Sequence, residues 1–298
     1  MVVIIVRTFG EVRAAAHSAV SLVPTMGYLH EGHMSLIGAA SQTGDTTVVS
    51  LFVNPTQFGD SADFVAYPHN EARDAAIAEA AGCDIFFAPS ADEVYPLGHR
   101  VTVSVGGVGD AMEGRFRHGH FEGVATVVAK LFAGVQPRRA FFGRKDAQQL
   151  AVVRTLRDGL RFPVEVIGMP TVREQDGLAL SSRNTQIGKG VRREALSLSR
   201  ALFSAADAIE QGERDSAAIA KIARSVAAAT PQVEVEYLEV ADSMSAAPIE
   251  EIDRDAFVAI AAKVGGVRLI DNIAVDAVTL ATDRGIMLDK QSILYEED

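Results

Sequence analysis

The chain has 298 residues, of which 48% are hydrophobic and 22% are charged, and its formal net charge is −11 at pH 7. These values are ordinary for a globular enzyme, and the negative charge argues against a general nucleic-acid-binding protein. No apolar run reaches the roughly 18 residues of a membrane span, and the one cysteine, Cys83, cannot form an intramolecular disulfide. We therefore expect a cytoplasmic protein without membrane or nucleic-acid partners, in which Cys83 is a core residue.

Apolar runs rich in β-branched residues alternate with alanine-rich amphipathic stretches through the first 175 residues. The runs predict strands at residues 2–6, 19–23, 46–53, 85–87, 140–142 and 164–168. The stretches between them predict helices at residues 33–43, 70–81, 124–135 and 147–160. Such alternation is typical of βαβ units, so we expect an α/β fold with a doubly wound parallel sheet, Rossmann-like in type. Ligands of such sheets bind beyond the carboxyl ends of the strands.

The pattern changes after residue 180. Helices are predicted at residues 191–211 and 216–229, and strands at residues 233–240, 256–264 and 268–270. These elements predict a smaller C-terminal α+β domain at residues 181–275, which follows the Rossmann-like domain of residues 1–180. Residues 276–298 have weak periodicity and are expected to form an acidic C-terminal extension.

The segment PTMGYLHEGH, residues 24–33, follows the second predicted strand and contains two histidines three residues apart. Residues at this spacing share one helix face, so His30 and His33 can point at one ligand. The N-terminus of a helix offers backbone N–H groups that suit phosphate, and Gly32 lets a base or ribose approach the backbone. The other interpretation is half of a metal site or two surface histidines, although zinc would need further ligands.

Polar side chains also follow the third predicted strand, where Pro55 stops the ladder. Asn54 and Gln57 are uncharged there, and a glutamine can donate to one group while it accepts from another. Gln57 could therefore recognise a hydroxyl and a carboxylate together. A turn whose polar groups satisfy one another is the alternative.

A third polar segment, GRKDAQQ at residues 143–149, follows the predicted strand at residues 140–142. Lys145 supplies a compact charge for phosphate, and Asp146 can cap the next helix or contact a ribose or metal. Gln148 and Gln149 are adjacent, so only one of them faces a given ligand. A fourth segment, LSSRN at residues 180–184, offers two hydroxyls and the guanidinium of Arg183, which suits phosphate oxygens. A charged turn and a capped loop are the respective alternatives.

These motifs in their order and spacing resemble the pantothenate synthetase family of the HxGH nucleotidyltransferase superfamily. The resemblance covers about residues 2–275 and rests on PTMGYLHEGHMSLI, SLFVNPTQF, AYP, GHFEGVATVVAKLF, FFG-KDAQQL, PTVREQDGLALSSRN and VEYLEVAD. It implies a ligase that joins pantoate to β-alanine with ATP and magnesium and releases AMP and pyrophosphate by way of a pantoyl adenylate. It also implies a homodimer.

The family's residue roles carry over to matching positions of this chain. The resemblance assigns catalytic roles to His30, His33, Lys145 and Arg183, with His33 as a proton donor. It assigns pantoate to Gln57 and Gln149, with Gln57 also near β-alanine, and it leaves Mg²⁺ bound mainly by the nucleotide phosphates. The implied ATP contacts are Met26, Gly27, Tyr28, Leu29, His30, Glu31, Gly32, His33, Gly143, Arg144, Lys145, Asp146, Val172, Leu180, Ser181, Ser182 and Arg183.

One position departs from the family, because Arg144 stands where an acidic residue is usual. His118 and His120 could bind metal, although a structural or phosphate-facing role is favoured. Three other functions stay open: a cytidylyltransferase or other enzyme with the same HxGH core, a tRNA synthetase relative, and a protein that senses ATP without catalysis. The glutamines, the net charge and the second domain disfavour the first two.

Overall fold

The computed structural model describes residues 2–59, 64, 65, 67–188 and 190–295, and the chain forms two compact units. The first unit contains residues 1–143 and 152–169, and the second contains residues 144–151 and 170–298. The change of unit therefore falls before the expected boundary at residues 180 and 181. Each unit has its own hydrophobic core.

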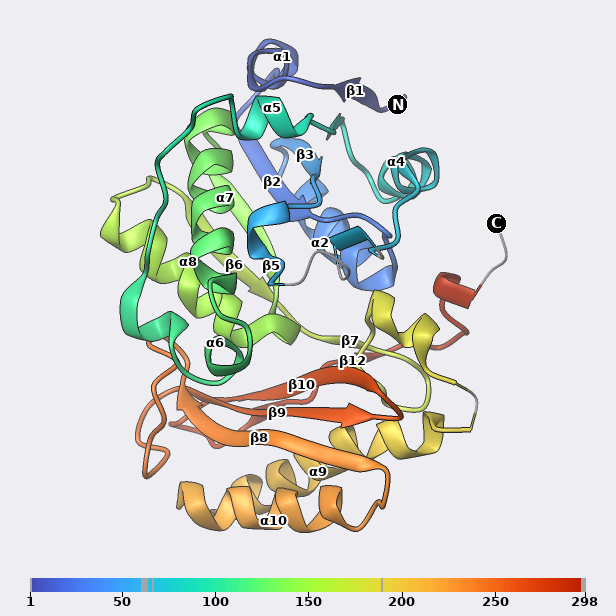
Figure 1. The fold of residues 1–298 in the computed structure, drawn as a ribbon, viewed down its shortest axis with the longest axis vertical. Coiled ribbons are helices and arrows are strands. Elements are labelled where there is room, and N and C mark those ends of the chain that lie inside the picture. Colours follow the sequence, from blue (N-terminus) through green and yellow to red (C-terminus); the bar gives the residue numbers. More distant parts are fainter. Residues whose placement is uncertain (1, 60–63, 66, 189, 296–298) are drawn as a thin grey trace. The chain divides into compact units, whose positions relative to one another are not determined.

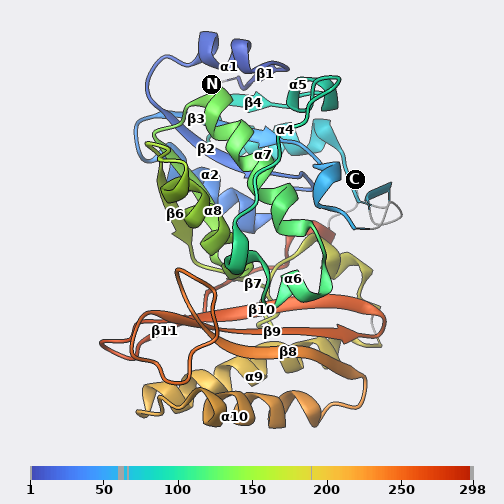
Figure 2. The ribbon, with the colours of Figure 1, turned by 60° about the vertical axis from the view of Figure 1, so that its left-hand side comes forward.

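Six strands build the parallel sheet of the first unit, in the order β1-β4-β3-β2-β5-β6. Figure 1 labels β1, β2, β3, β5 and β6, and Figure 2 labels β4. The strand order reverses beside β2, since β3 and β4 lie on one side of it and β5 and β6 on the other. Such a switch point is where open α/β sheets bind ligands, and the PTMGYLHEGH segment begins there. The strands are β1 (Ile4–Val6), β2 (Val20–Thr25), β3 (Thr46–Leu51), β4 (Ile85–Phe87), β5 (Arg139–Gly143) and β6 (Glu165–Met169).

Helices cover both faces of this sheet. Successive strand residues point to opposite sides, so the apolar strands present apolar side chains on each face, and helices bury them. Val23, Val49 and Phe86 form one core with α2 and α4. On the other face, the rings of Phe87 and of Phe9 in α1 lie 5.0 Å apart. The predicted doubly wound α/β fold is confirmed. The helices are α1 (Phe9–Ala15), α2 (Glu31–Ser41), α4 (Glu71–Ala80), α5 (Ala91–Val94), α6 (Glu113–Phe116), α7 (His120–Val135) and α8 (Ala147–Gly159).

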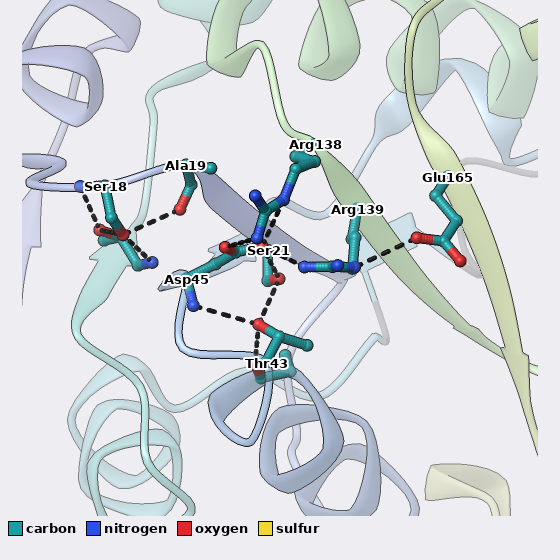
Figure 3. A network of polar contacts seen from close by, with 10 residues as sticks. Ser18, Ala19, Ser21, Thr43, Asp45, Arg138, Arg139 and Glu165 are labelled. Carbon is teal, nitrogen blue, oxygen red and sulfur yellow. Dashed lines mark hydrogen bonds and ion pairs between the residues drawn. The ribbon is translucent and has the colours of Figure 1, made fainter.

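Asp45 ties the amino ends of three strands together, at the edge opposite the switch-point motifs (Figure 3). Its buried carboxylate forms ion pairs with Arg138 and Arg139, and Arg139 also pairs with Glu165 at 3.1 Å. Ser21 of β2 donates to Asp45 Oδ2 at 3.1 Å. This network accounts for the two adjacent arginines at the start of β5, Arg138 and Arg139, as structural residues of the sheet.

The second unit contains a four-stranded antiparallel sheet in the order β11-β10-β9-β8. Helices α9 and α10 lie along one face of it (Figures 1 and 2), and Leu198 and Leu202 of α9 share a core with Val258 and Ile260 of β9. This unit confirms the expected smaller α+β part. Its elements are α9 (Arg192–Glu210), α10 (Ser216–Ala228), β8 (Val233–Asp242), β9 (Ala256–Val264), β10 (Val267–Val275) and β11 (Thr282–Asp283).

The residues after Val275 differ from an extension with weak periodicity. β11 pairs with β10, and β12 (Ile286–Met287) pairs in parallel with β7 (Val172–Arg173). The backbone N–H of Ile286 donates to the carbonyl of Thr171 at 2.7 Å, and that of Leu288 donates to the carbonyl of Arg173 at 2.8 Å. A strand of two residues is too short to show an alternation of apolar and polar residues in the sequence. The weak periodicity after Val275 therefore does not reveal these pairings.

Five short 3₁₀ helices complete the described elements, and three of them carry motif residues. They are η1 (Pro55–Gln57), η2 (Gly106–Gly109), η3 (Arg144–Asp146), η4 (Ser182–Gln186) and η5 (Ile293–Tyr295). Within the described ranges, no helix combines the length and apolar character needed to cross a membrane. Cys83 is buried, and burial raises the pKa of its thiol to about 12, which suits the core role expected for it.

Candidate active site

The chain leaves β2 through a tight turn that brings the histidines to the carboxyl end of the strand. Gly27 has φ +91° and Tyr28 has φ +53°, both in the left-handed region. A Cβ on Gly27 would lie 2.4 Å from Leu51 Cδ1 and 2.9 Å from Asp74 Oδ2. Glycine is therefore required at this position both by the backbone conformation and by the space around it.

Asp74 of α4 holds this turn, and none of the sequence motifs includes it. Its fully buried carboxylate accepts the backbone N–H of Tyr28 at 2.8 Å and that of Leu29 at 2.7 Å. Burial raises the pKa of Asp74, and the two backbone donations oppose that rise. The neighbouring Arg73 donates to the Leu29 carbonyl at 3.0 Å and lies over the Tyr28 ring. An aspartate on the same buried face as Ala75 and Ala78 is the signal that could have revealed it.

His30 and His33 cap helix α2 reciprocally. His30 is the N-cap residue, and its Nδ1 accepts the backbone N–H of Gly32 at 3.1 Å. His33 Nδ1 accepts the backbone N–H of His30 at 3.3 Å, and the two ring centroids are 4.2 Å apart. A neutral imidazole that accepts at Nδ1 carries its proton on Nε2. The two rings thus become paired Nε2–H donors at a helix N-terminus, an arrangement suited to anionic oxygens.

Gly32 makes room for this arrangement in a way that the sequence did not predict. A Cβ there would lie 2.8 Å from His30 Cε1 and 3.0 Å from His30 Nδ1. The group that approaches the Gly32 backbone in the structure is the His30 ring, whereas the sequence suggested a base or ribose.

Gln57 lies at the end of η1 and is held by Asn54. Asn54 Nδ2 donates to Gln57 Oε1 at 3.0 Å and to the Gly123 carbonyl at 3.1 Å, while Asn54 Oδ1 accepts the Tyr95 hydroxyl at 2.8 Å. Gln57 Nε2 in turn lies 3.0 Å from Met26 Sδ, so it meets the start of the histidine turn. These two contacts use one amide hydrogen and one oxygen lone pair of Gln57, and an amide has two of each.

Helix α7 packs closely under η1. A Cβ on Gly123 would lie 2.6 Å from the Thr56 carbonyl oxygen and 2.7 Å from the Gln57 backbone nitrogen. His120 is buried, with Nδ1 2.9 Å from the Gln57 carbonyl oxygen and Nε2 3.1 Å from Arg117. These contacts favour the structural interpretation of His120, and His118 is exposed. Among the residues that the structure describes, no group of three or more His, Cys, Asp or Glu side chains is arranged to hold a metal ion.

The GRKD segment begins at Gly143, the last residue of β5, and continues as η3 in the second unit. Asn272 of β10 donates to the backbone carbonyls of Arg144 at 2.9 Å and Lys145 at 2.7 Å, which fixes the turn. The Lys145 ammonium lies 3.7 Å from Asp146 Oδ1. Arg144, the departure from the family pattern, pairs with Asp283 of β11 at 2.9 Å. In the first turns of α8, Gln148 is buried and Gln149 is half-buried.

The LSSRN segment follows a small hairpin that starts at β7. The backbone N–H of Leu180 donates to the carbonyl of Val172 at 2.9 Å, so these two predicted ATP contacts are neighbours. Ser181 caps η4 by accepting the backbone N–H of Arg183 at 3.3 Å. Ser182 and Arg183 are both half-buried. The structure therefore contains the capped loop that was the alternative interpretation of this segment. The same loop carries the polar side chains of Ser182 and Arg183.

The predicted site residues thus form two sets. In the first unit, the Gln57 amide contacts Met26. This unit also contains Gly143 and the rest of the turn, including Tyr28, Leu29, Glu31 and His33. The second unit contains Arg144–Asp146, Gln149, Val172 and residues 180–183. Asp74 and Asn272, which hold two of these segments, were not predicted as site residues, and Asn54 was noted only as a polar group at a strand end. Asp74 and Asn272 are buried polar side chains far along the chain from the backbone groups that they bind, whereas Asn54 lies three residues from Gln57.

A parallel sheet with a capped histidine pair at its switch point defines an α/β enzyme class that binds phosphorylated ligands. Comparison with known proteins gives the particular family. The model of the family described as "Pantoate-beta-alanine ligase" matches residues 4–274. The chain belongs to the pantoate–β-alanine ligase family, as the sequence motifs predicted. It is a ligase that uses ATP to condense pantoate with β-alanine.

Relatives of known name agree with this membership. A pantothenate synthetase of Moorella thermoacetica is 47% identical over 258 residues, which covers 87% of this chain and 91% of that protein. The crystal structure of pantothenate synthetase from Thermus thermophilus is 44% identical, with a TM-score of 0.85 over 90% of this chain and 98% of that one. A Francisella tularensis pantoate–β-alanine ligase, complexed with β-γ ATP and β-alanine, is 28% identical with a TM-score of 0.70, and the match covers 91% and 97%.

Proposed function

We propose that this ligase works through a pantoyl adenylate, with His30 and His33 as donors to the ATP phosphates. The carboxylate of pantoate attacks the α-phosphorus, the bond to the bridging oxygen breaks, and pyrophosphate leaves. The amine of β-alanine then attacks the activated carbonyl, AMP leaves, and the amide loses a proton to give pantothenate. Neither step needs a protein nucleophile, because adenylyl transfer depends on positioning and charge stabilisation.

The single observation that supports these roles best is the reciprocal cap of α2. Each histidine uses Nδ1 to accept a backbone N–H, so each ring presents Nε2–H as a donor. Donors that are fixed before charge develops cost no reorganisation during the reaction, which makes them effective. His33 is the proposed proton donor to the leaving group.

Gln57 is the proposed ligand of pantoate and lies near the incoming β-alanine, with Gln149 as the second pantoate amide. Neutral amides orient a carboxylate without the strong attraction of an ammonium, which would lower its nucleophilicity. The contact of Asn54 Nδ2 with Gln57 Oε1 orients the Gln57 amide in advance. This preorganisation supports a binding role.

Residues of the second unit are the proposed remaining ATP ligands. Lys145 and Arg183 bring positive charge to the phosphates and count as catalytic residues together with the histidines. Arg144, Asp146, Val172 and residues 180–182 complete the set from the second unit, and Gly143 and residues 26–32 are the proposed ATP ligands from the first unit. The backbone bonds from Asn272 to the η3 turn support a preformed contact surface.

Magnesium is proposed to arrive with ATP, bound mainly by the phosphates, where it would neutralise charge on the transferring group. This fits a segment in which the Lys145 ammonium lies 3.7 Å from the Asp146 carboxylate, so that a positive and a negative side chain are neighbours there. A homodimer and a cytoplasmic location are proposed from the family resemblance and from the single cysteine.

The test is an AMP-release assay with each substrate omitted in turn, together with pantoate-dependent exchange of labelled pyrophosphate into ATP. Replacing His33 by Ala is expected to slow the exchange by about a few hundredfold, the usual cost of one placed donor. Ser41→Ala, at the other end of α2, is the matched control. Gln57→Ala is expected to raise KM for pantoate far more than KM for ATP.

Several results would contradict these roles. Near-normal exchange by the His33→Ala variant would remove His33 from the mechanism. Exchange that does not depend on pantoate would favour another nucleotidyltransferase, and ATP binding without AMP release would favour an ATP sensor.

A further inference from the structure

The residues that follow β10 form a segment beside both proposed nucleotide loops of the second unit. We call residues 282–295 the C-terminal strap. The strap begins as β11 on the edge of β10, continues as β12 along β7, and ends in η5. The family model ends at residue 274, so the strap lies beyond the matched part of the chain.

The first attachment of the strap is to the GRKD turn. Asp283 Oδ2 lies 2.9 Å from Arg144 Nη1, and both side chains are partly exposed. Arg144 occupies the position where the resemblance leads us to expect an acidic residue. An acidic side chain there would repel Asp283, so the arginine and the strap match each other in charge.

The second attachment is to the LSSRN loop, through the buried carboxylate of Glu174. Glu174 Oε1 accepts the Tyr295 hydroxyl at 2.9 Å and the Asn184 amide at 2.6 Å. Glu174 Oε2 lies 2.8 Å from Arg192, whose guanidinium also donates to the Tyr295 hydroxyl at 2.8 Å. Asn184 directly follows Arg183 and also donates to the Ala179 carbonyl at 3.0 Å. One carboxylate thus links the end of the strap to the residue after Arg183.

The middle of the strap is fixed as well. A Cβ on Gly285 would lie 2.3 Å from the Thr171 carbonyl oxygen, and its φ is +89°. The fully buried Arg173 donates to the Arg284 carbonyl and forms a two-pronged ion pair with Asp271 at 2.7 and 2.9 Å. The strap is therefore held along its length, which lets its two ends fix what they touch.

We propose that the C-terminal strap positions the GRKD and LSSRN loops for ATP, with Asp283 and Tyr295 as positioning residues. This inference rests on the proposed function of Arg183 and its neighbours as ATP ligands. The Tyr295 phenol is protonated at physiological pH, as tyrosine ordinarily is, and it donates that proton to Glu174 Oε1; burial raises its pKa further, to about 12.

The experiment measures KM for each substrate in the full-length Tyr295→Phe variant, which removes the hydroxyl and keeps the ring. We expect KM for ATP to rise about fivefold, the order expected when a hydrogen bond to a charged group is lost and part of its effect reaches the loop. KM for pantoate should stay within twofold. Asp283→Asn should raise KM for ATP by about twofold, because its ion pair is partly exposed. Backbone amides of residues 179–184 should exchange hydrogen faster in Tyr295→Phe, with the far-ultraviolet circular dichroism unchanged.

Asp176→Asn is the matched control, since Asp176 also pairs with Arg192 but is not bonded to Asn184 or Tyr295. It should leave KM for ATP unchanged. Unchanged KM for ATP and unchanged exchange in Tyr295→Phe would overturn the proposal. Arg183→Ala separates the two hypotheses: if it raises KM for ATP while Tyr295→Phe does not, only the strap proposal fails. If neither variant changes KM for ATP, the proposed role of the loop fails too, and the strap proposal falls with it.

Discussion

Replacing Asp74 by Ala tests whether one buried carboxylate holds the histidine turn. The substitution leaves the backbone N–H groups of Tyr28 and Leu29, now 2.8 and 2.7 Å from Asp74, without their acceptor. Hydrogen bonds to a charged group contribute about 1.5–3 kcal/mol each. Two of them give a range of about 3–6 kcal/mol, and relaxation of the turn should bring the loss toward the lower end. The left-handed Tyr28 would relax too, since such a conformation is strained without support.

Asp74→Asn separates the loss of the hydrogen bonds to the turn from the loss of the buried negative charge. An amide keeps one acceptor oxygen but turns an NH₂ group toward the other backbone N–H, so one of the two bonds is lost. Because burial raises the pKa of Asp74, a neutral side chain also recovers part of the desolvation cost of the ionised form. We therefore expect a loss of about 1–2 kcal/mol for Asn against about 3 kcal/mol for Ala.

The assay is urea unfolding followed by circular dichroism, together with KM for ATP in the AMP-release assay. Glu79→Ala, an exposed change on the same helix, is the control and should stay within about 0.5 kcal/mol. The Ala variant should also raise KM for ATP, because the turn carries both histidines. A loss below about 1 kcal/mol with unchanged KM would refute the view that Asp74 fixes the turn.

Three further predictions concern other parts of the chain. Asp45→Ala should lower the free energy of unfolding by about 2–3 kcal/mol, because it removes the acceptor of two arginines; an equal loss in the exposed Glu165→Ala control would argue against this. Gly123→Ala should cost about 1–3 kcal/mol in urea unfolding and raise KM for pantoate by displacing η1, whereas Gly38→Ala, which has open space, should not. The raised pKa of Tyr295, about 12, means that the folded chain keeps a proton that the unfolded chain loses near pH 10. Stability from this group is thus complete below about pH 10 and declines between about pH 10 and 12. Tyr295→Phe should lack that part of the decline in urea midpoints, and parallel curves for the two proteins would count against it.

Much of the fold could be predicted from the sequence because buried parallel strands carry a strong local pattern. The strand predicted at residues 85–87 and the strand predicted at 256–264 match β4 and β9 at both ends. The predicted start of one helix was too late: α7 begins at His120, four residues before the predicted start, because Gly119 and the polar residues after it do not show a helical pattern for a first turn that packing stabilises. Helix α1, whose capping box joins Thr8 and Glu11, was not predicted.

The unpredicted parts depend on contacts between distant residues. Asp74 accepts the backbone N–H of Tyr28, which lies 46 residues away in the sequence, and Asn272 donates to the backbone carbonyl of Lys145, 127 residues away. No local period marks such pairs, and an isolated polar residue on a buried face is the only sign of them. The proposed ligands themselves were accessible to sequence reasoning, since they cluster in short motifs at strand ends.

The reciprocal cap of α2 has a consequence for how variants of this protein should be interpreted. Nδ1 of His30 and Nδ1 of His33 each accept a backbone N–H at the start of α2, and the outer nitrogen of each ring is only the proposed donor to phosphate. Removal of a whole ring is therefore expected to weaken the start of the helix as well as to delete that proposed donor. Asparagine offers an oxygen close to where Nδ1 sits and is a favoured N-cap residue. His30→Asn would thus preserve the start of the helix while taking away the outer nitrogen, and it separates folding from chemistry in a single substitution.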